Sequence, residues 1–437
     1  MRKFMIAASL IALAFQAPAP AQAQDRTLHE AIAADYRANL AGLFEHFHEN
    51  PELSGREVNT AARMAQELRA LGYDVTTGVG GTGVVAILRN GAGPTVMLRA
   101  DMDGLPLEER SGVPNPSHVR QTDMAGVEQP VMHACGHDVH ITAMVGTARQ
   151  LAARRSHWHG TLMLIVQPAE ETVSGARAML ADGLYTRFPK PDYAVAFHVM
   201  AQLAAGQIDI ADTNVASSSD MVTIQVRGVG SHGAFPHLGI DPVLIASQIV
   251  VSLQSMVGRT ISPLQPAVIS VGSIHGGVKS NIIPEEVNLA LTVRADTPQV
   301  RQQLLDGIDR VARGTAIAMG VPENRLPVVT RSATETTPAT INDPATAQRV
   351  RAAIRGQLGA DRVVQAPRQG MGAEDFAYFV TPESGVRGVY FNVGGTPRDQ
   401  VATAPSHHSP LFRITPEPSV TAGVEAMVTA AEALLQR

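Results

Sequence analysis

The sequence contains 437 residues, with 35 Lys and Arg against 40 Asp and Glu, and 45% of its residues are hydrophobic. This composition is typical of a globular protein and excludes a disordered or fibrous chain. The net charge of −5 argues against nucleic acid as a partner. Cys135 is the only cysteine, so an intramolecular disulfide is excluded. The length predicts two or three structural units.

The N-terminus has the three parts of a secretory signal. Arg2 and Lys3 precede an apolar run over 4–15, and the small-residue site Ala21-Gln22-Ala23 follows. The apolar run is shorter than the about 20 residues that span a membrane. We therefore expect a cleavable signal peptide over 1–23, a periplasmic or secreted mature protein, and no membrane anchor.

Helical periodicity and β-rich runs alternate along the first half of the mature chain. Two helices are expected within 27–72. Beyond them we expect strands at Tyr73–Thr77, Val84–Leu88, Thr95–Arg99, Thr161–Gln167 and Tyr193–His198, and helices at Val139–Arg154 and Ala176–Leu180. The alternation predicts an α/β domain whose sheet is mostly parallel and covered on both faces.

A polar cluster at Ser217–Ser219 predicts a domain boundary. The elements expected beyond it are strand, helix, strand, strand, helix and strand, at Met221–Val229, Pro242–Met256, Ala267–Ile274, Glu286–Val293, Gln299–Met319 and Leu326–Arg331. This β-α-β-β-α-β order predicts an α+β domain inserted over 217–335. The α/β domain is then expected over 24–216 and again over 336–437.

Chemically active side chains collect at the ends of the predicted strands. Asp101 and Asp103 follow one strand, Glu170 and Glu171 follow another, and His198 ends a third. Ligands of open α/β sheets bind at the carboxyl ends of strands, so one site can collect all of these groups.

The segment His133-Ala134-Cys135-Gly136-His137-Asp138 lies before the helix expected at 139, and Gly136 lets Cys135 and His137 converge. Thiolate, imidazole and carboxylate are zinc-type ligands. A lone buried Cys is more often a small hydrophobe, but the surrounding His and Asp favour a ligand here. His133 and His140 are expected to support the site rather than to bind metal.

Two further patterns bear on function. Of the adjacent pair Glu170 and Glu171, one carboxylate can bind a metal while the other takes a proton from activated water. The glycines over 78–83 match the dinucleotide pattern G-x-G-x-x-G. A dinucleotide site needs a helix after the glycines, whereas residues 84–88 are expected to form a strand, so the pattern predicts a glycine-rich hairpin.

Seven motifs occur in chain order: RADMDGLP (99–106), MHACGHD (132–138), QPAEE (167–171), GSHGAFPH (230–237), SNIIP (280–284), MGAEDF (371–376) and HSP (408–410). Together they resemble the aminoacylase/carboxypeptidase family of dinuclear metallohydrolases, within it the branch of auxin–amino acid conjugate hydrolases and hippurate hydrolases. The resemblance implies a zinc-exopeptidase-like catalytic domain and an inserted ferredoxin-like domain that serves as lid and dimerisation surface, and hence a homodimer.

The resemblance also implies residue roles. The implied ligands of two divalent ions (Zn²⁺ or Mn²⁺, with Co²⁺ as a further candidate) are Cys135, His137, Glu171, His198 and His408. His408 is chosen over His407 because it directly precedes Ser409-Pro410. Glu170 is implied as general base, and His232 as the group that stabilises the tetrahedral intermediate, often across the dimer. Asn281 and Arg294 would hold the free carboxylate of the substrate, and Asp101, Asp103 and Asp138 would support the metals.

We therefore expect an exported amidohydrolase that cleaves the amide bond of N-acyl or N-aminoacyl amino acids, using water activated by the metals and Glu170 as the base. Two alternatives stay open: a dipeptidase or carboxypeptidase on the same scaffold, and a non-catalytic metal- or ligand-binding protein. Thr172-Val173-Ser174 departs from the glycine-rich continuation common in this branch, which leaves substrate preference open.

Overall fold

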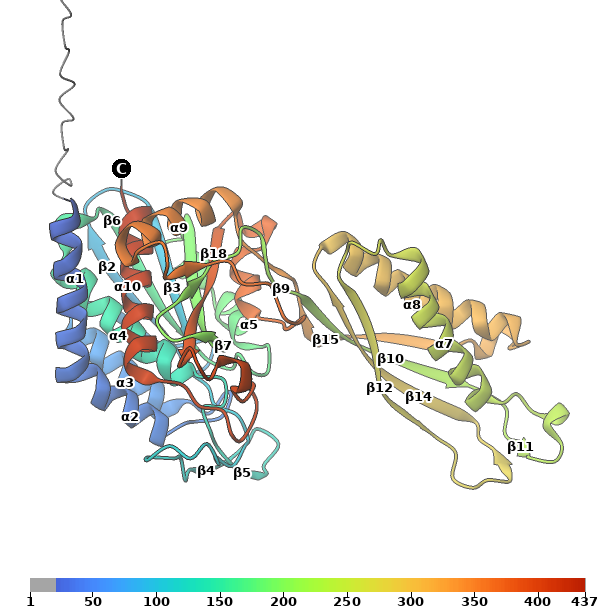
Figure 1. Ribbon diagram of the computed structural model, residues 1–437. Helices are drawn as coiled ribbons and strands as arrows, with labels where there is room; N and C mark the ends of the chain where they lie inside the picture. Colours follow the sequence, from blue (N-terminus) through green and yellow to red (C-terminus); the bar gives the residue numbers. More distant parts are fainter. Residues whose placement is uncertain (1–20, 437) are drawn as a thin grey trace, which may run out of the picture.

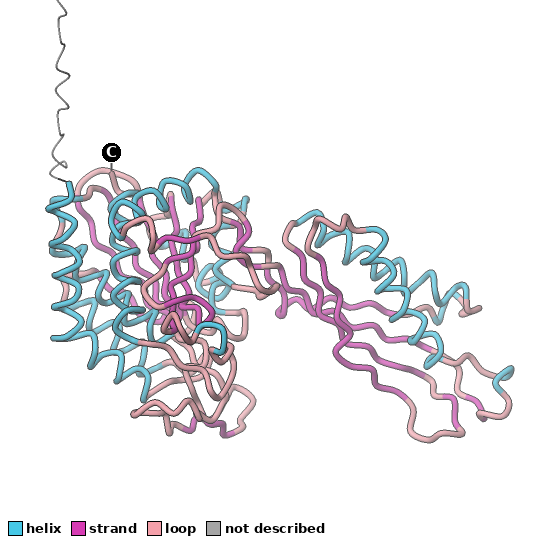
Figure 2. The backbone as a smooth tube through the Cα atoms, in the orientation of Figure 1, coloured by secondary structure: helices cyan, strands magenta, loops and turns pink. Residues whose placement is uncertain are grey.

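The computed structural model describes residues 21–436, and the part of the predicted signal peptide over 1–20 lies outside the described residues. Figure 1 shows two lobes joined by crossing strands. Figure 2 shows helices on both sides of the sheet in the larger lobe, and helices on one side of the sheet in the smaller lobe.

An eight-stranded sheet forms the centre of the larger lobe, in the order β1-β2-β6-β3-β7-β18-β8-β17. Its strands are β1 (Asp74–Val79), β2 (Gly83–Asn90), β6 (Gly160–Gln167), β3 (Thr95–Asp101), β7 (Tyr193–Ala204), β18 (Arg387–Thr396), β8 (Ile208–Asp209) and β17 (Val363–Val364). The four central strands β6, β3, β7 and β18 are parallel, and antiparallel pairs lie toward the edges. The predicted α/β fold with a mostly parallel sheet is confirmed.

Helices cover both faces of this sheet because side chains on successive strand residues point to opposite faces. On β2, for example, Val84 and Ala86 join one buried cluster, whereas Val85 and Ile87 join another. The helices on the first face are α1 (Ala21–Asp35), α2 (Ala41–Glu49), α3 (Val58–Ala70), α4 (His137–Ala153), α9 (Pro344–Leu358) and α10 (Pro416–Leu434). The second face is covered by α5 (Gly175–Ala181), α6 (Leu184–Arg187) and the 3-10 helix η5 (Asp375–Val380).

The glycine-rich turn joins β1 to β2 as a hairpin. A Cβ atom at Gly80 would lie 2.4 Å from the backbone nitrogen of Met179 in α5, so only glycine fits at this position. Residues 84–88 lie in β2, and no helix follows the glycines. The glycines therefore serve close packing between the hairpin and α5.

The smaller lobe is a two-layer α+β unit. Its antiparallel sheet has the order β12-β14-β10-β15, with strands β12 (Ala267–Gly276), β14 (Glu286–Ala295), β10 (Ser218–Arg227) and β15 (Val328–Thr337). Helices α7 (Pro242–Thr260) and α8 (Pro298–Ala318) pack on one face. This order confirms the predicted ferredoxin-like arrangement. Two short strands, β11 (Ser231–His232) and β13 (Ile282–Ile283), pair at the far tip of the lobe.

Helix α7 is the one described helix that is long and apolar enough to cross a membrane by length and composition. One side of it packs on the sheet through Ile245, Ile249 and Leu253. Three of its other apolar side chains, Val243, Leu244 and Val251, are exposed.

The expected boundaries differ from the structure at one strand that matters for the site. His198 was expected at the end of its strand, but β7 continues to Ala204. Pairing of β7 with β3 stops at Ala196, whereas pairing with β18 continues. His198 therefore lies within a strand rather than at its end, two residues beyond the last residue of β7 that pairs with β3.

Candidate metal centre

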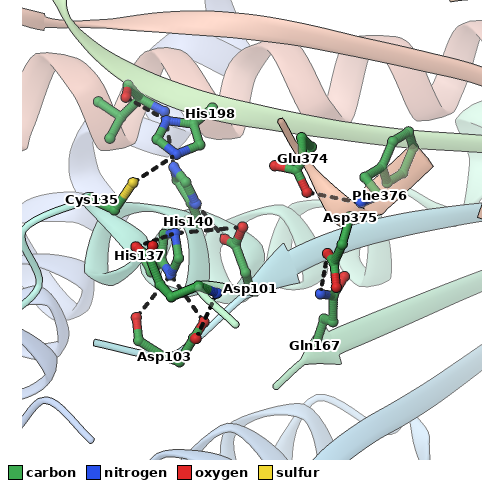
Figure 3. A network of polar contacts seen from close by, with 12 residues as sticks. Asp101, Asp103, Cys135, His137, His140, Gln167, His198, Glu374, Asp375 and Phe376 are labelled. Carbon is green, nitrogen blue, oxygen red and sulfur yellow. Dashed lines mark hydrogen bonds and ion pairs between the residues drawn. The ribbon is translucent and has the colours of Figure 1, made fainter. Parts of the chain in front are cut away.

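Of the five groups of potential metal ligands among the described residues, two contain Cys135 and lie beyond the ends of β3 and β6. One contains Cys135, His137 and His198, and the other contains Cys135, Glu171 and His408; within each group the donor atoms lie within 4.8 Å of one another. Figure 3 shows Cys135, His137 and His198 facing a common space. The structure thus brings together all five residues expected to bind metal, and Cys135 belongs to both groups.

Gly136 makes the local geometry possible. Its φ of +85° lies in the left-handed region, and a Cβ atom there would lie 2.3 Å from Cγ1 of Val199. Glycine adopts this conformation without steric penalty. Helix α4 begins directly afterwards, at His137 rather than at the expected Val139. The turn places the Cys135 thiol and the His137 ring on the same side of the chain.

His137 and His198 are oriented by backbone carbonyls. The Nδ1 atom of His137 lies 2.8 Å from the carbonyl oxygen of Asp103, and that of His198 lies 2.7 Å from its neighbour's carbonyl oxygen. A ring that donates through Nδ1 presents Nε2 as the electron-pair donor, which is the usual arrangement of metal-binding histidines. Both rings therefore present Nε2 to the cluster.

Two buried polar atoms in the cluster lack a hydrogen-bond partner among the described residues. They are Nε2 of His137 and Oε1 of Glu171, which lie 3.9 Å apart. Buried polar groups are normally satisfied, and a cation between these atoms would satisfy both. Together with the thiol and imidazole donors, they fit a divalent transition metal.

The thiol of Cys135 lies in an acidic environment. Its Sγ is 3.3 Å from Nε2 of His198. Burial and the carboxylates of Glu171 and Glu170 raise the pKa of the Cys135 thiol well above its usual value. A bound cation acts in the opposite direction, because coordination deprotonates a thiol. The thiolate form of Cys135 thus depends on metal binding.

Asp101, one of the acids predicted to support the site, already has hydrogen-bond partners on both carboxylate oxygens. Asp101 lies 2.5 Å from both Nη1 of Arg99 and Nδ1 of His140. The Nε2 atom of His140 accepts the Val199 N–H at 2.9 Å. Since both nitrogens of this ring are occupied, His140 orients Asp101 and is not available as a ligand. Burial, although opposed by Asp101, lowers the pKa of His140 to about 3, which keeps the ring neutral.

Asp103 and Asp138 differ in what they reach. Asp103 accepts the backbone N–H of Glu171 at 3.0 Å, so it holds a ligand-bearing turn. Oδ2 of Asp138 instead lies 2.8 Å from Nδ1 of His48. Asp138 is linked to the metal centre only because it directly follows His137 in the sequence.

Glu170 has a carboxylate that is not committed to other groups. The residue is 8% exposed, and no hydrogen bond reaches its carboxylate from the described residues. Burial and then the charges of Glu374 and Glu171 raise the pKa of Glu170 well above its usual value. Arg99 offsets part of this negative charge by binding Glu374 at 2.7 Å. A carboxylate with a raised pKa suits proton transfer.

His407 and His408 have different surroundings. The Nε2 atom of His408 lies 3.2 Å from Oε2 of Glu171. His407 accepts the Ala201 N–H at 3.2 Å and packs against Phe412, with ring centroids 4.8 Å apart. Of the two, only His408 belongs to a donor group of the cluster.

The remaining predicted residues lie on the smaller lobe. His232 is on β11, at the tip farthest from the larger lobe (Figure 1), and the carbonyl oxygen of Asn281 accepts the neighbouring Gly233 N–H at 2.8 Å. Arg294 is near the opposite end of β14, roughly 26 Å from Glu286 at the strand's start. Within one chain, neither His232 nor Asn281 reaches the metal centre, and Asn281 and Arg294 cannot share one carboxylate.

Several residues of the site have no counterpart in the sequence analysis. Arg99 and Glu374 lie within recognised motifs, but their buried ion pair has no local sequence pattern. Glu57 accepts a hydrogen bond from the turn before Glu170. No pattern in the neighbouring sequence marks Glu57 as part of the site.

The model of peptidase family M20/M25/M40 matches residues 97–433, which is more than half of the chain. The chain belongs to this family. A hippurate hydrolase of Campylobacter jejuni is 34% identical over 78% of this chain and 86% of its own length. Thermostable carboxypeptidase 2 of Saccharolobus solfataricus is 34% identical over 83% and 87%.

The solved structures include Bacillus subtilis YXEP, described as a dinuclear metal-binding peptidase of family M20. It has a TM-score of 0.75 and 27% identity, covering 94% of this chain and 99% of that one. The predicted family is confirmed, and with it the assignment to hydrolases that act on amide or peptide bonds. The non-catalytic alternative loses its support.

Proposed function

We propose that this M20 protein is an exported amidohydrolase that removes the acyl group from N-acyl amino acids with two divalent metal ions. One observation carries the proposal: two donor groups share Cys135, and the uncommitted carboxylate of Glu170 lies beside them. The hippurate hydrolase among the relatives supports the substrate class.

The residues of this chain divide the work. Cys135, His137 and His198 would hold one ion, and Cys135, Glu171 and His408 the other. Ions there would act as Lewis acids and lower the pKa of a water molecule. Glu170 takes the proton from the attacking water and delivers it to the leaving nitrogen. Burial and the neighbouring carboxylates raise the pKa of Glu170, which favours its acceptance of a proton.

The substrate-binding residues point to a homodimer. His232 and Asn281 lie together at the tip of the smaller lobe, away from their own metal centre. A second chain would bring this tip to the centre, where the imidazole can stabilise the developing oxyanion. Arg294, nearer the joint between the lobes, would hold the substrate carboxylate from the same chain.

The smaller lobe has a surface suited to such a dimer. β12 is one of the two edge strands of its sheet and pairs only with β14. Exposed apolar side chains lie on β12 (Ile274) and on α7 (Val243, Leu244 and Val251), and Gln254 of α7 bonds the β12 backbone. Unpaired edges and apolar patches favour association. Sedimentation of Val251→Asp, compared with wild type, tests this surface.

A substrate panel tests the activity. The chain from residue 24, loaded with Zn²⁺, Mn²⁺ or Co²⁺, should hydrolyse N-acyl amino acids such as N-benzoylglycine faster than dipeptides, and chelation should abolish both activities. Faster cleavage of dipeptides would favour the peptidase alternative. The similarity to thermostable carboxypeptidase 2 supports that alternative. Failure to hydrolyse any amide with any of the metals would overturn the proposal.

Export has its own test. Residues 1–23, fused to a reporter enzyme that is active only outside the cytoplasm, should give activity in a Gram-negative host. Replacing Arg2 and Lys3 together by Glu should abolish that activity, because the basic start is one of the three parts of the signal.

A further inference from the structure

We propose that Glu57 is a positioning residue, whose buried carboxylate holds the turn carrying Glu170 and Glu171 in the shape that hydrolysis requires. The inference rests on the proposed function, since it matters only if these two residues serve as base and ligand. Glu57 touches neither the predicted ligand atoms nor a reacting atom, so it acts through the turn.

The turn after β6 has an unfavourable backbone conformation. Ala169 has a φ of +50° and Val173 has a φ of +54°. Left-handed conformations are uncommon for residues other than glycine, and for a β-branched residue such as Val they are exceptional. Such conformations persist only where surrounding contacts impose them, and they gather at functional sites. The shape of this turn therefore depends on contacts from outside it.

Two buried carboxylates supply those contacts. Oε1 of Glu57 accepts the Ala169 N–H at 2.8 Å, directly before Glu170. Oδ2 of Asp103 accepts the Glu171 N–H at 3.0 Å, directly after Glu170. The backbone N–H groups of the two residues that flank Glu170 are thus bonded to side chains from other parts of the chain.

Glu57 is itself held rigidly. The residue is 0% exposed. Its Oε1 also accepts the Gly55 N–H at 2.8 Å, and its Oε2 accepts the Thr82 hydroxyl at 2.6 Å. A carboxylate with its oxygens fixed in this way forms strong, directional hydrogen bonds. The position of the Ala169 N–H is therefore set by the segment before α3 and by the glycine-rich hairpin.

The neighbouring Glu52 shows what a purely structural acid does here. Glu57 occupies the N-cap position of α3, but its side chain makes no capping hydrogen bond. Glu52, 6% exposed, accepts the Thr60 N–H at 2.7 Å and the Asn59 N–H at 3.2 Å in its place. Glu52 therefore caps α3, and Glu57 binds the turn that precedes Glu170 instead of capping the helix.

This pair provides a matched experiment. Glu57→Leu and Glu52→Leu each replace one buried carboxyl group of the same segment by a side chain of similar size that accepts no hydrogen bond, and both are compared with wild type on the N-acyl amino acid that wild type hydrolyses fastest. We measure kcat, KM, the thermal unfolding midpoint, metal content and the visible spectrum of the Co²⁺-loaded protein.

Glu57→Leu should lower kcat by about 10–100-fold, the range typical of residues that orient metal ligands, and should alter the Co²⁺ spectrum. Its KM should stay within about threefold of wild type, because substrate-binding groups are untouched. Glu52→Leu should lower the unfolding midpoint, and it should leave kcat and the Co²⁺ spectrum unchanged. Equal effects of the two variants on kcat, or an unchanged spectrum in Glu57→Leu, would overturn the inference.

Ala169→Gly gives a second, independent test. Glycine adopts a φ of +50° without strain, so the turn should depend less on Glu57 in this background. The loss of kcat caused by Glu57→Leu should then be smaller in Ala169→Gly than in wild type, and an equal loss in both backgrounds would contradict the inference. If Glu57→Leu alone does not fold, the comparison is made between Ala169→Gly and the double variant. If the wild-type protein hydrolyses none of the substrates, the proposed function itself is refuted. This result needs no variant, so it can be distinguished from failure of the inference about Glu57.

Discussion

The Nε2 atom of His408 lies 3.2 Å from Oε2 of Glu171, and this contact links the loop after β18 to the turn after β6. His407, its neighbour in sequence, bonds the Ala201 backbone and packs on Phe412 instead. The two adjacent histidines thus have different surroundings. His408 faces the metal centre, whereas His407 packs against the protein interior next to it.

The two histidines give the first prediction. His408→Ala should bind about one divalent ion fewer per chain and lower kcat/KM by more than about 100-fold, because it removes a donor and not merely an orienting group. Elemental analysis after gel filtration measures the metal content. His407→Ala should keep the wild-type metal content, since its imidazole only supports the wall. Equal metal loss in both variants would contradict the assignment.

His48 gives a prediction about pH and stability. Its Nδ1 lies 2.8 Å from Oδ2 of Asp138, and its Nε2 lies 3.3 Å from Oε1 of Glu109. Burial lowers the pKa of His48, but these two carboxylates outweigh burial and raise it to about 10. A pKa raised on folding stabilises the protein fully below the unfolded value of about 6.5, and the stabilisation is lost as pH rises through about 10.

His48→Gln should therefore lower the free energy of unfolding by roughly 2–4 kcal/mol at about pH 6. The difference from wild type should shrink steadily toward about pH 9.5, as measured by urea denaturation at several pH values. His46→Gln on the same helix is the control, because His46 is exposed and should show only a small effect. If the difference in unfolding free energy between wild type and His48→Gln stays constant with pH, His48 is not stabilised as a cation by Asp138 and Glu109.

The distance between His232 and its own metal centre predicts complementation between chains. Glu170→Gln and His232→Ala should each be nearly inactive alone. When they are co-expressed, about half of the dimers are hybrids with one intact site, so roughly a quarter of wild-type activity should return. Glu170→Gln with His408→Ala is the control, because no hybrid site is then intact. No recovery in the first pair would show that His232 does not act across a dimer.

The fold class and the ligand-bearing turns of the metal centre could be predicted because each depends on residues that are close together in the sequence. Gly136 between Cys135 and His137 indicates a turn that brings two donors together, and Glu170 with Glu171 directly follows an apolar strand. The choice of His408 over His407 needed the family motif, because nothing in the neighbouring sequence tells the two apart.

The features that could not be predicted depend on distant partners. Glu57 bonds Ala169 and Thr82, and a lone acid before a helix gives no indication that it is buried. Its N-cap position would ordinarily suggest a helix cap, a role that Glu52 takes instead. The length of β7 is likewise set by pairing with β18 late in the chain, so the place of His198 within a strand could not be read locally.

The measurement that tests the central claim most directly combines turnover and metal content in Glu170→Gln. Gln has the shape of Glu but cannot accept the proton, and no described hydrogen bond to the carboxylate is lost. The variant should keep two divalent ions per chain and lose at least about a thousandfold in kcat on the best N-acyl amino acid. A fully metal-loaded Glu170→Gln that hydrolyses this substrate at near wild-type rate would contradict the account.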